Sequence, residues 1–143
     1  MKNIFKEGAI SPNFIAESIA KHSSKNDIGT HQIFLGQIRA DQRDNQKVTH
    51  ISYEAYEEMA NEKMQEIREF CFSTFEISCM HVYHSLGKIA VGEICLFVFV
   101  SSPHRKAATE ACSFLVEKIK KDLPIWGKEI FENNVEAWKI NRS

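Results

Sequence analysis

The sequence predicts a single α+β domain that spans residues 1–143. Its length fits one domain, and a composition that is 43% hydrophobic and 26% charged is typical of a globular protein. Apolar runs of strand length alternate with stretches whose apolar residues recur at helical spacing. The sequence contains no internal repeat and no low-complexity segment, so nothing divides it into further domains.

The N-terminal segment predicts a strand, a helix and a second strand. Ile4–Ile10 has the content of a short strand. Ser11 and Pro12 predict a helix start, because serine caps the first turn and proline suits its first position. Ile28–Arg39 predicts a longer strand, in which Gly36 indicates a bulge or the close approach of another backbone.

A polar segment separates this strand from the next two elements. Residues 40–47 have no apolar side chain beyond an alanine, and they predict a mobile loop beside Arg39. Val48–Tyr53 predicts the return strand. From Tyr56 to Cys71 the apolar residues follow the clearest helical spacing in the chain, so this segment predicts an amphipathic helix.

Two further strands follow. Ile77–Leu86 predicts one that contains His81 and His84, three residues apart. On a strand this spacing places the two imidazoles on opposite faces, which disfavours a two-histidine metal site. Residues 87–92 predict a turn between two glycines. Glu93–Ser101 predicts the central strand, since its apolar run indicates cover on both faces.

The last predicted helix follows Pro103 and ends before Pro124, because proline is tolerated at a helix start and not in its interior. Its apolar positions form one stripe: Ala108, Ala111, Cys112, Leu115 and Ile119. Residues 138–140 predict a short last strand or a packed tail.

Composition limits the possible partners. A net charge of −1 gives no overall field that would attract nucleic acid or a membrane surface, so an anion site must be local. No apolar run has the length of a membrane span, and the polar N-terminal residues lack the pattern of a signal peptide. The four cysteines lie in apolar surroundings without a CxxC pair, which predicts reduced thiols in a cytoplasmic protein.

Several motifs are missing from the sequence: nucleotide-binding GxxxxGK[ST] and GxGxxG loops, the GxSxG nucleophile turn, and metal ligands at a usual spacing. What remains is a set of cations suited to phosphate, carboxylate or an oxyanion: Arg39, His104, Arg105, Lys120 and Lys128. These cations fit an enzyme with anionic substrates. They also fit a non-catalytic module that binds a phosphorylated ligand or an acidic protein tail, or ordinary solvated charges.

Four short motifs, in order along the chain, carry a family resemblance. They are Phe34-Leu35-Gly36-Gln37-Ile38-Arg39; Ser102-Pro103-His104-Arg105 before an alanine-rich helix start; Lys120 with Pro124-Ile125-Trp126; and Lys128-Glu129. With these motifs at these spacings, the sequence resembles the large, catalytic subunit of molybdopterin synthase, and the resemblance covers nearly the whole chain. The resemblance implies an α+β fold of the hammerhead type, with an antiparallel or mixed sheet flanked by helices.

The resemblance also implies a reaction. Enzymes of this family convert cyclic pyranopterin monophosphate into molybdopterin by adding two sulfurs that form a dithiolene. Each sulfur arrives as a thiocarboxylate on the C-terminal Gly-Gly tail of a small ubiquitin-like subunit. A central homodimer of large subunits carries one small subunit at each end, giving a heterotetramer. The resemblance implies no metal and no organic cofactor for this step.

The site residues implied by the resemblance are two catalytic and eight substrate-binding positions. The catalytic pair is Lys120 and Lys128. The substrate-binding set is Gln37, Ile38, Arg39, His104, Arg105, Gly127, Glu129 and Arg142. The chain departs from the family at one position, because the family has its lysine directly after the tryptophan, where this chain has Gly127. Either Lys128 takes that role, or the enzyme relies on Lys120 alone.

Arg105 and Lys120 lie fifteen residues apart, near opposite ends of the predicted helix. At about 1.5 Å per residue their Cα atoms are roughly 22 Å apart, and each side chain reaches only about 6–7 Å. One helix therefore cannot bring both to one small substrate. If both are functional, we expect a two-fold homodimer in which Lys120 and Arg39 of one chain meet His104 and Arg105 of the other.

Overall fold

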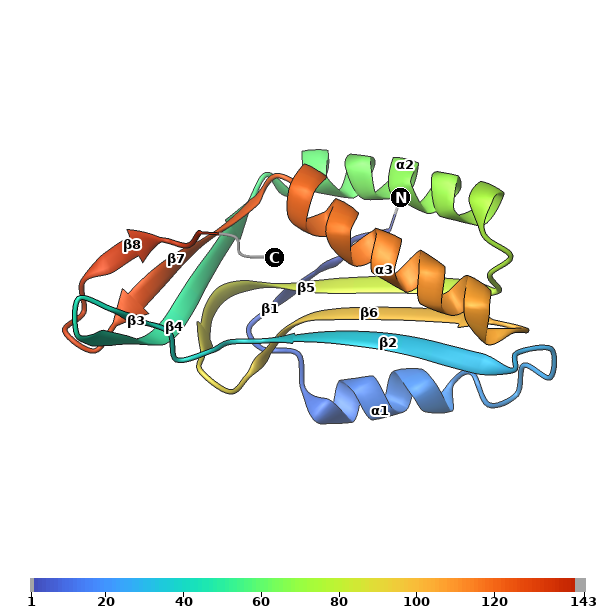
Figure 1. The fold of residues 1–143 in the computed structure, drawn as a ribbon, viewed down its shortest axis with the longest axis horizontal. Coiled ribbons are helices and arrows are strands. Elements are labelled where there is room, and N and C mark those ends of the chain that lie inside the picture. The colour runs from blue at the N-terminus through green and yellow to red at the C-terminus, as the bar shows by residue number, and fades with distance from the viewer. Residues whose placement is uncertain (1, 141–143) are drawn as a thin grey trace.

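A continuous, mostly antiparallel sheet runs through the computed structural model, which describes residues 2–140 (Figure 1). The strands lie in the order β2 (Thr30–Gln37), β6 (Ile94–Ser102), β5 (Cys79–Ala90), β4 (Gln46–Ala55), β7 (Ile125–Phe131) and β8 (Glu136–Trp138). β1 (Phe5–Glu7) joins β5 as its parallel neighbour, and β3 (Gln42–Arg43) pairs with β4. The predicted α+β fold with an antiparallel or mixed sheet is confirmed.

The sheet has two arms, because β5 changes partners along its length. One arm contains β2 and β6, and the other contains β4, β7 and β8. Residues 79–84 of β5 pair with β6, whereas residues 87–90 pair with β4. Gly87 lies at the change and has a φ of +86°, which glycine adopts without a steric penalty. The predicted turn over residues 87–92 is therefore wrong for its first four residues, which are strand; the turn begins at Val91. A glycine that bends a strand resembles a turn glycine in the sequence.

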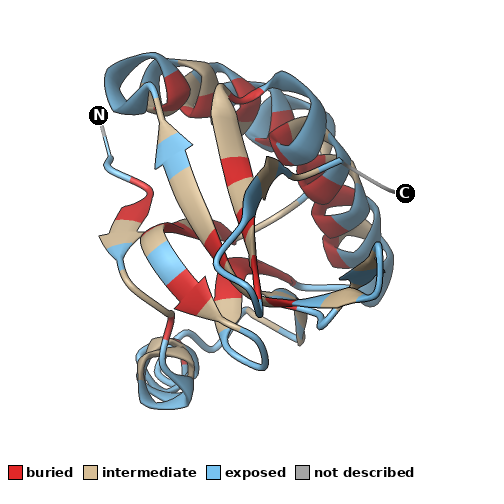
Figure 2. Ribbon diagram, turned by 90° about the vertical axis from the view of Figure 1, so that its left-hand side faces the viewer, coloured by how far each residue is buried: buried red, intermediate tan, exposed pale blue. Residues whose placement is uncertain are grey.

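The helices α1 (Pro12–Ala20), α2 (Glu57–Thr74) and α3 (Arg105–Asp122) cover the two faces of the sheet. α2 and α3 lie side by side on one face, and α1 lies on the other (Figures 1 and 2). The predicted start of α1 is confirmed, because the Ser11 hydroxyl accepts a hydrogen bond from the backbone N–H of Phe14 at 3.1 Å.

The core lies between the sheet and the α2–α3 layer. All five residues of the predicted stripe on α3 are buried, and β6 is buried from Cys95 to Ser102, so it is covered on both faces as expected. Each large apolar side chain buried in this way contributes about 1.5–3 kcal/mol to folding. Under α1 a second cluster contains Ile10, Phe97 and Phe99. None of the helices within residues 2–140 is long and apolar enough to cross a membrane.

The segment expected to be a mobile loop, residues 40–47, instead contains a hairpin. Asp44 and Asn45 both have positive φ (48° and 63°), the pattern of the two-residue turn that matches the strand twist. Arg43 anchors the hairpin to β7 and β8 of the same arm, because its guanidinium lies 3.2 Å from the buried carboxylate of Glu129 and donates to the carbonyl of Trp138. The predicted last strand is confirmed as β8, two residues earlier than expected.

His81 and His84 of β5 lie on opposite faces, as predicted. The ring of His84 packs edge-on against Tyr53, with centroids 4.9 Å apart, and its Nδ1–H donates to the carbonyl of Ser85 at 2.7 Å. His81 faces α1 and approaches His22, with their Nε2 atoms 3.2 Å apart. Burial disfavours the charged imidazolium and lowers the pKa of both His81 and His84 to about 4.

We predict that the protein loses stability as the pH falls from 6.5 towards 4. In that range the unfolded chain protonates His84 at its ordinary pKa of 6.5, while the folded chain resists until about 4. Because the unfolded state binds the extra proton, acid favours unfolding, by up to about 3 kcal/mol for this buried group. Urea midpoints at pH 7 and pH 4.5 measure the loss.

His84→Asn is the diagnostic variant, because its amide nitrogen can take the place of Nδ1 without titrating. We expect it to reduce the pH dependence of the urea midpoint. Asn13→Ala, at an exposed position without a titrating side chain, serves as the control and should leave the pH dependence unchanged. An equal pH dependence in wild type and His84→Asn would contradict the prediction.

Candidate active site

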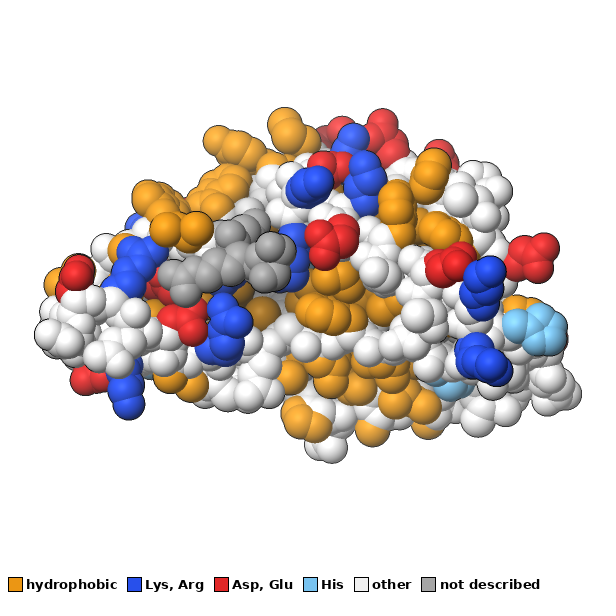
Figure 3. Space-filling view, viewed as in Figure 1, with side chains coloured by type: hydrophobic (Ala, Val, Ile, Leu, Met, Phe, Trp, Pro, Cys, Tyr) orange, Lys and Arg blue, Asp and Glu red, His pale blue; other side chains and the backbone are white. Residues whose placement is uncertain are grey.

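A pocket of about 440 Å³ opens where the two arms of the sheet meet the C-terminal end of α3. Residues of β2, β4, β5, β6 and β7 line the pocket. The residues that follow β2 and the residue that follows β8 complete this part of its wall. The titratable side chains that we consider for catalysis or binding in this pocket are Arg39, Tyr53, His84, Cys95, Lys120 and Lys139. Figure 3 shows several Lys and Arg side chains over the junction between α3 and the arm that contains β7 and β8.

Five of the residues proposed from the sequence line this pocket: Gln37, Ile38, Arg39, Lys120 and Gly127. The register of β2 against β6 shifts between Gly36 and Gln37, so the predicted bulge is confirmed. The bulge ends the pairing and directs the following residues along the pocket wall. There the exposed Arg39 forms an ion pair with Asp41, with Nε and Oδ1 3.2 Å apart.

Lys120 reaches the pocket from the last turn of α3. The helix orients it, because the neighbouring Ile119 is buried in the core while Lys120 is exposed. The helix ends two residues later, and the carbonyl of Pro124 accepts a hydrogen bond from the backbone of Tyr56 at 3.1 Å. This contact joins the end of α3 to the start of α2 and fixes the position of the pocket rim.

Lys128 and Glu129 do not line the pocket. The ammonium of Lys128 lies 3.4 Å from Glu136 and 4.8 Å from the ring centroid of Trp138, on the face of β7 away from the pocket. Glu129 is buried and paired with Arg43. The roles assigned to these two residues stay predictions.

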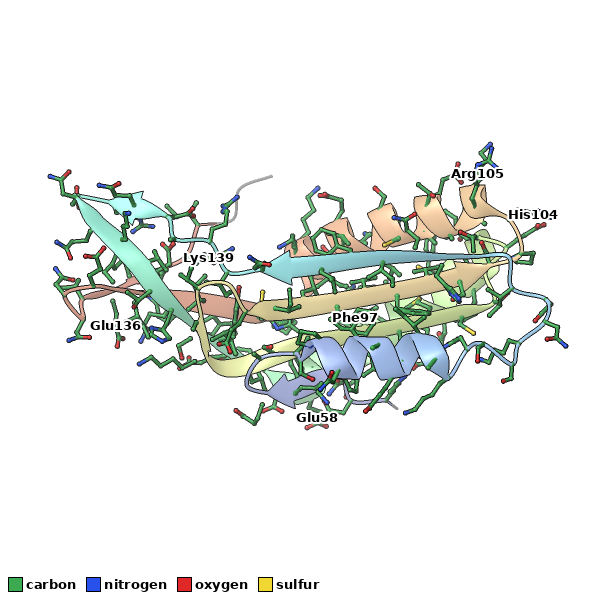
Figure 4. The ribbon with its side chains drawn as sticks, turned by 90° about the horizontal axis from the view of Figure 1, so that it is seen from below. Glu58, Phe97, His104, Arg105, Glu136 and Lys139 are labelled. Atoms are coloured by element: carbon green, nitrogen blue, oxygen red, sulfur yellow. The ribbon has the colours of Figure 1, made fainter. Side chains whose placement is uncertain are left out.

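His104 and Arg105 lie at one end of the molecule, far from Lys139, and both are exposed (Figure 4). Within one chain they are therefore remote from the pocket, in agreement with the helix-length argument. Arg142 lies outside the described residues.

Lys139, Tyr53, His84 and Cys95 were missed by sequence reasoning, although all four line the pocket. The Tyr53 hydroxyl donates to the Cys95 sulfur at 3.7 Å, and burial raises the pKa of both groups. The thiol therefore stays protonated near neutral pH and is no ready nucleophile. Burial lowers the pKa of the Lys139 ammonium, and the nearby charge of Lys120 lowers it further.

A second polar cluster lies between α1 and the sheet. His22, Cys79 and His81 place their potential metal-ligand atoms within 4.8 Å of one another, a proximity that their sequence spacing concealed. Each is already hydrogen-bonded: the ammonium of Lys25 donates to the Cys79 sulfur at 3.1 Å, and that of Lys2 to His81 Nδ1 at 3.0 Å. Two ammonium groups at the ligand atoms repel a divalent cation, so this cluster favours docking of α1 over metal binding.

Comparisons with known proteins identify the family of this chain. Residues 9–122 match the family model described as "MoaE protein". The chain is 40% identical over 124 residues to the molybdopterin synthase catalytic subunit of Pyrococcus abyssi, covering 87% of this chain and 82% of that one. For the Bacillus subtilis catalytic subunit, identity is 36% over 122 residues, 85% of this chain and 76% of the relative. The Drosophila mojavensis catalytic subunit is 41% identical over 115 residues, but the match spans only 31% of its length.

Solved structures share the whole fold. The molybdopterin synthase structure from Staphylococcus aureus superimposes with a TM-score of 0.84 at 28% identity, covering 99% of both chains. A chain in the complex of subunits 1 and 2 of molybdopterin-converting factor from Helicobacter pylori has the same fold, with a TM-score of 0.80 at 20% identity over 98% and 92% of the two chains. Both the fold and the sequence resemblance are thereby confirmed, and this chain belongs to the MoaE protein family.

Proposed function

We propose that this chain is the catalytic subunit of a molybdopterin synthase and that the 440 Å³ pocket is its active site. The reaction adds two sulfurs to cyclic pyranopterin monophosphate and yields the dithiolene of molybdopterin. One observation carries the proposal: Arg39, Lys120 and Lys139 come from three separate parts of the chain and line one pocket. Their convergence gives a site for anions in a protein whose net charge is only −1.

The charges of the reactants explain why such a site is needed. The pterin carries a cyclic phosphate, and the thiocarboxylate that brings the sulfur is also an anion. At 4 Å two like charges repel by about 1 kcal/mol in water and by about 4 kcal/mol near a protein surface. The cations that line the pocket offset this repulsion before the reaction begins. Arg39, whose guanidinium offers paired donors, suits the phosphate.

We assign Lys120 to the reacting group. When the sulfur has been transferred, the tail of the small subunit must be released from an acyl intermediate by water, which produces an oxyanion in the transition state. An ammonium group beside that oxygen stabilises the developing charge, and removing one such donor typically costs about 10²–10³ in rate. Lys120 lines the pocket together with Ile125 and Trp126, and we expect an extended tail to enter along these residues.

The partner is a small ubiquitin-like subunit that ends in Gly-Gly. Tyr56 and Met59, beside the pocket at the start of α2, are both more than half exposed and offer apolar contact area to such a partner. Its narrow glycine tail would then reach Lys120. The four cysteines, all free and buried, fit a reducing compartment, and we place the enzyme in the cytoplasm.

Reconstitution tests the proposed function. Mixing the protein with a thiocarboxylated small subunit and cyclic pyranopterin monophosphate should produce molybdopterin, measured by mass spectrometry. Removing the terminal Gly-Gly of the small subunit should abolish product, because the sulfur is carried on that tail. Binding of both reactants without any product would favour the alternative, a non-catalytic module for phosphorylated ligands or acidic tails. Full activity with the truncated partner would contradict the proposed route of sulfur.

We propose that His104 and Arg105 reach the active site of a second copy of the chain in a homodimer. They are exposed at the far end of α3, where a second copy related by a two-fold axis can place them against the first chain's Lys120 and Arg39. Each dimer then has two sites, and each site takes residues from both chains.

Complementation between inactive variants tests this shared site. In a mixed dimer of Arg105→Ala and Lys120→Ala, one site carries both defects and the other carries none. We therefore expect about a quarter of wild-type activity from a statistical mixture of dimers. A mixture of Arg39→Ala with Lys120→Ala is the matched control and should stay inactive, because every site then keeps one defect. Mixed dimers that form but remain inactive in the first pair would refute the shared site.

A further inference from the structure

The family's lysine after the tryptophan has no counterpart at the same position of this chain. Gly127 occupies it and lines the pocket with its backbone. A Cβ at this position would lie 2.8 Å from Ile51 Cγ2 and 3.0 Å from Tyr53 Cε1, so a side chain fits only if these neighbours shift. The next residue, Lys128, lies on the other face of β7. β7 therefore brings no ammonium group to the pocket.

Lys139, the residue that follows the neighbouring strand β8, brings an ammonium group to the pocket instead. Lys128 and Trp138 are register partners in the β7–β8 pair, and their side chains are in contact on one face. Because side chains alternate along a strand, Lys139 takes the opposite face, where Gly127 lies. The backbone N–H of Lys139 donates to the carbonyl of Gly127 at 2.9 Å, and the Lys139 side chain lines the pocket together with Lys120.

We infer that Lys139 is the second lysine of the active site and that it contacts an anionic group of a reactant in the pocket that Lys120 also lines. The inference rests on the proposed function. It names Lys139, in place of Lys128, as the lysine that acts with Lys120. The ammonium reaches the pocket from the edge strand of the sheet, at a position thirteen residues beyond Trp126. It takes the role that the family resemblance assigns to the residue at position 127.

The surroundings of Lys139 fit this role. Lys120 faces it from α3, and Arg39 and Asp41 lie in the segment after β2. The other titratable groups around it within residues 2–140 are Cys95 of β6, Glu129 of β7, Tyr53 of β4 and His84 of β5. Burial and then Lys120 lower the pKa of Lys139, whereas Cys95 and Glu129 raise it. A half-buried ammonium beside a second cation gains more from an arriving anion than an exposed lysine does.

The anion has two possible sources, and kinetics separate them. If Lys139 contacts the thiocarboxylate tail, Lys139→Ala should lower kcat and raise the KM for the small subunit. If it contacts the cyclic phosphate, the same variant should raise the KM for the pterin. In both cases we expect kcat/KM for the affected reactant to fall about 100-fold, the size typical of a lost charge contact in an active site.

The variants are chosen to distinguish chemistry from packing. Lys139→Met keeps most of the side chain's length without the charge and should be as inactive as Lys139→Ala. Lys139→Arg keeps the charge and should recover part of the activity. Lys21→Ala, an exposed lysine beyond the end of α1, is the control and should match wild type. Thermal unfolding identifies any variant that fails to fold.

A second readout does not depend on turnover. Reductive methylation with ¹³C-formaldehyde labels the lysines, and the Lys139 resonance is the one missing from Lys139→Arg. It should titrate below the ordinary lysine pKa of 10.5, and Lys120→Ala should move it upward by removing a neighbouring cation. A resonance that titrates at the ordinary lysine pKa and does not respond to the Lys120 variant would overturn the assignment of Lys139 to the shared pocket.

The outcomes separate this inference from the proposed function. A wild-type protein that makes no molybdopterin with both reactants present overturns the proposed function, whatever the titration shows. An active wild type with Lys139→Met and Lys139→Ala within threefold of it overturns only the role of Lys139. A 100-fold loss in Lys128→Ala, with Lys139→Ala unaffected, would do the same and would support Lys128 as the replacement.

Discussion

The bend of β5 at Gly87 is the constraint on which the rest of the structure depends. Before the bend this strand pairs with β6, and after it with β4, so one strand holds both arms of the sheet. The pocket exists because the arms diverge at that point. Gln37 and Arg39 enter it from one arm, and Tyr53 and Gly127 from the other. A strand that continued straight would leave these residues on separate surfaces.

The α3 helix explains why one chain holds only part of the cation set. Its apolar stripe is fixed against the sheet along its whole length, so its two ends cannot approach each other. Lys120 lies in the last turn, whereas His104 and Arg105 mark the other end (Figure 4). Within one chain the pocket therefore concentrates charge through Arg39, Lys120 and Lys139, which belong to different elements. Bringing like charges together in a partly buried site has a free-energy cost, which an anionic substrate offsets.

Features that depend on local sequence were predictable, and features that depend on pairing were not. The Ser11–Pro12 cap, the Gly36 bulge and the α3 stripe follow from residues close in sequence, and each was confirmed. Gly87 was taken for a turn because a single sequence does not show that pairing continues past a glycine. Lys139 was missed because its orientation follows from the register of β8 against β7. The motif resemblance predicts Gln37, Ile38, Arg39, Lys120 and Gly127 as site residues, and all five line the pocket.

The edge position of β8 makes the pocket sensitive to chain length. β7 and β8 are joined by a short turn in which Asn134 has a φ of +65°. Adding or deleting one residue in this turn would exchange the two faces of β8, since a one-residue slip reverses every side chain on a strand. The indole of Trp138 would then point into the pocket, and the ammonium of Lys139 would point outward. Among natural variants of this chain, the turn should therefore tolerate substitution far better than a single-residue insertion or deletion.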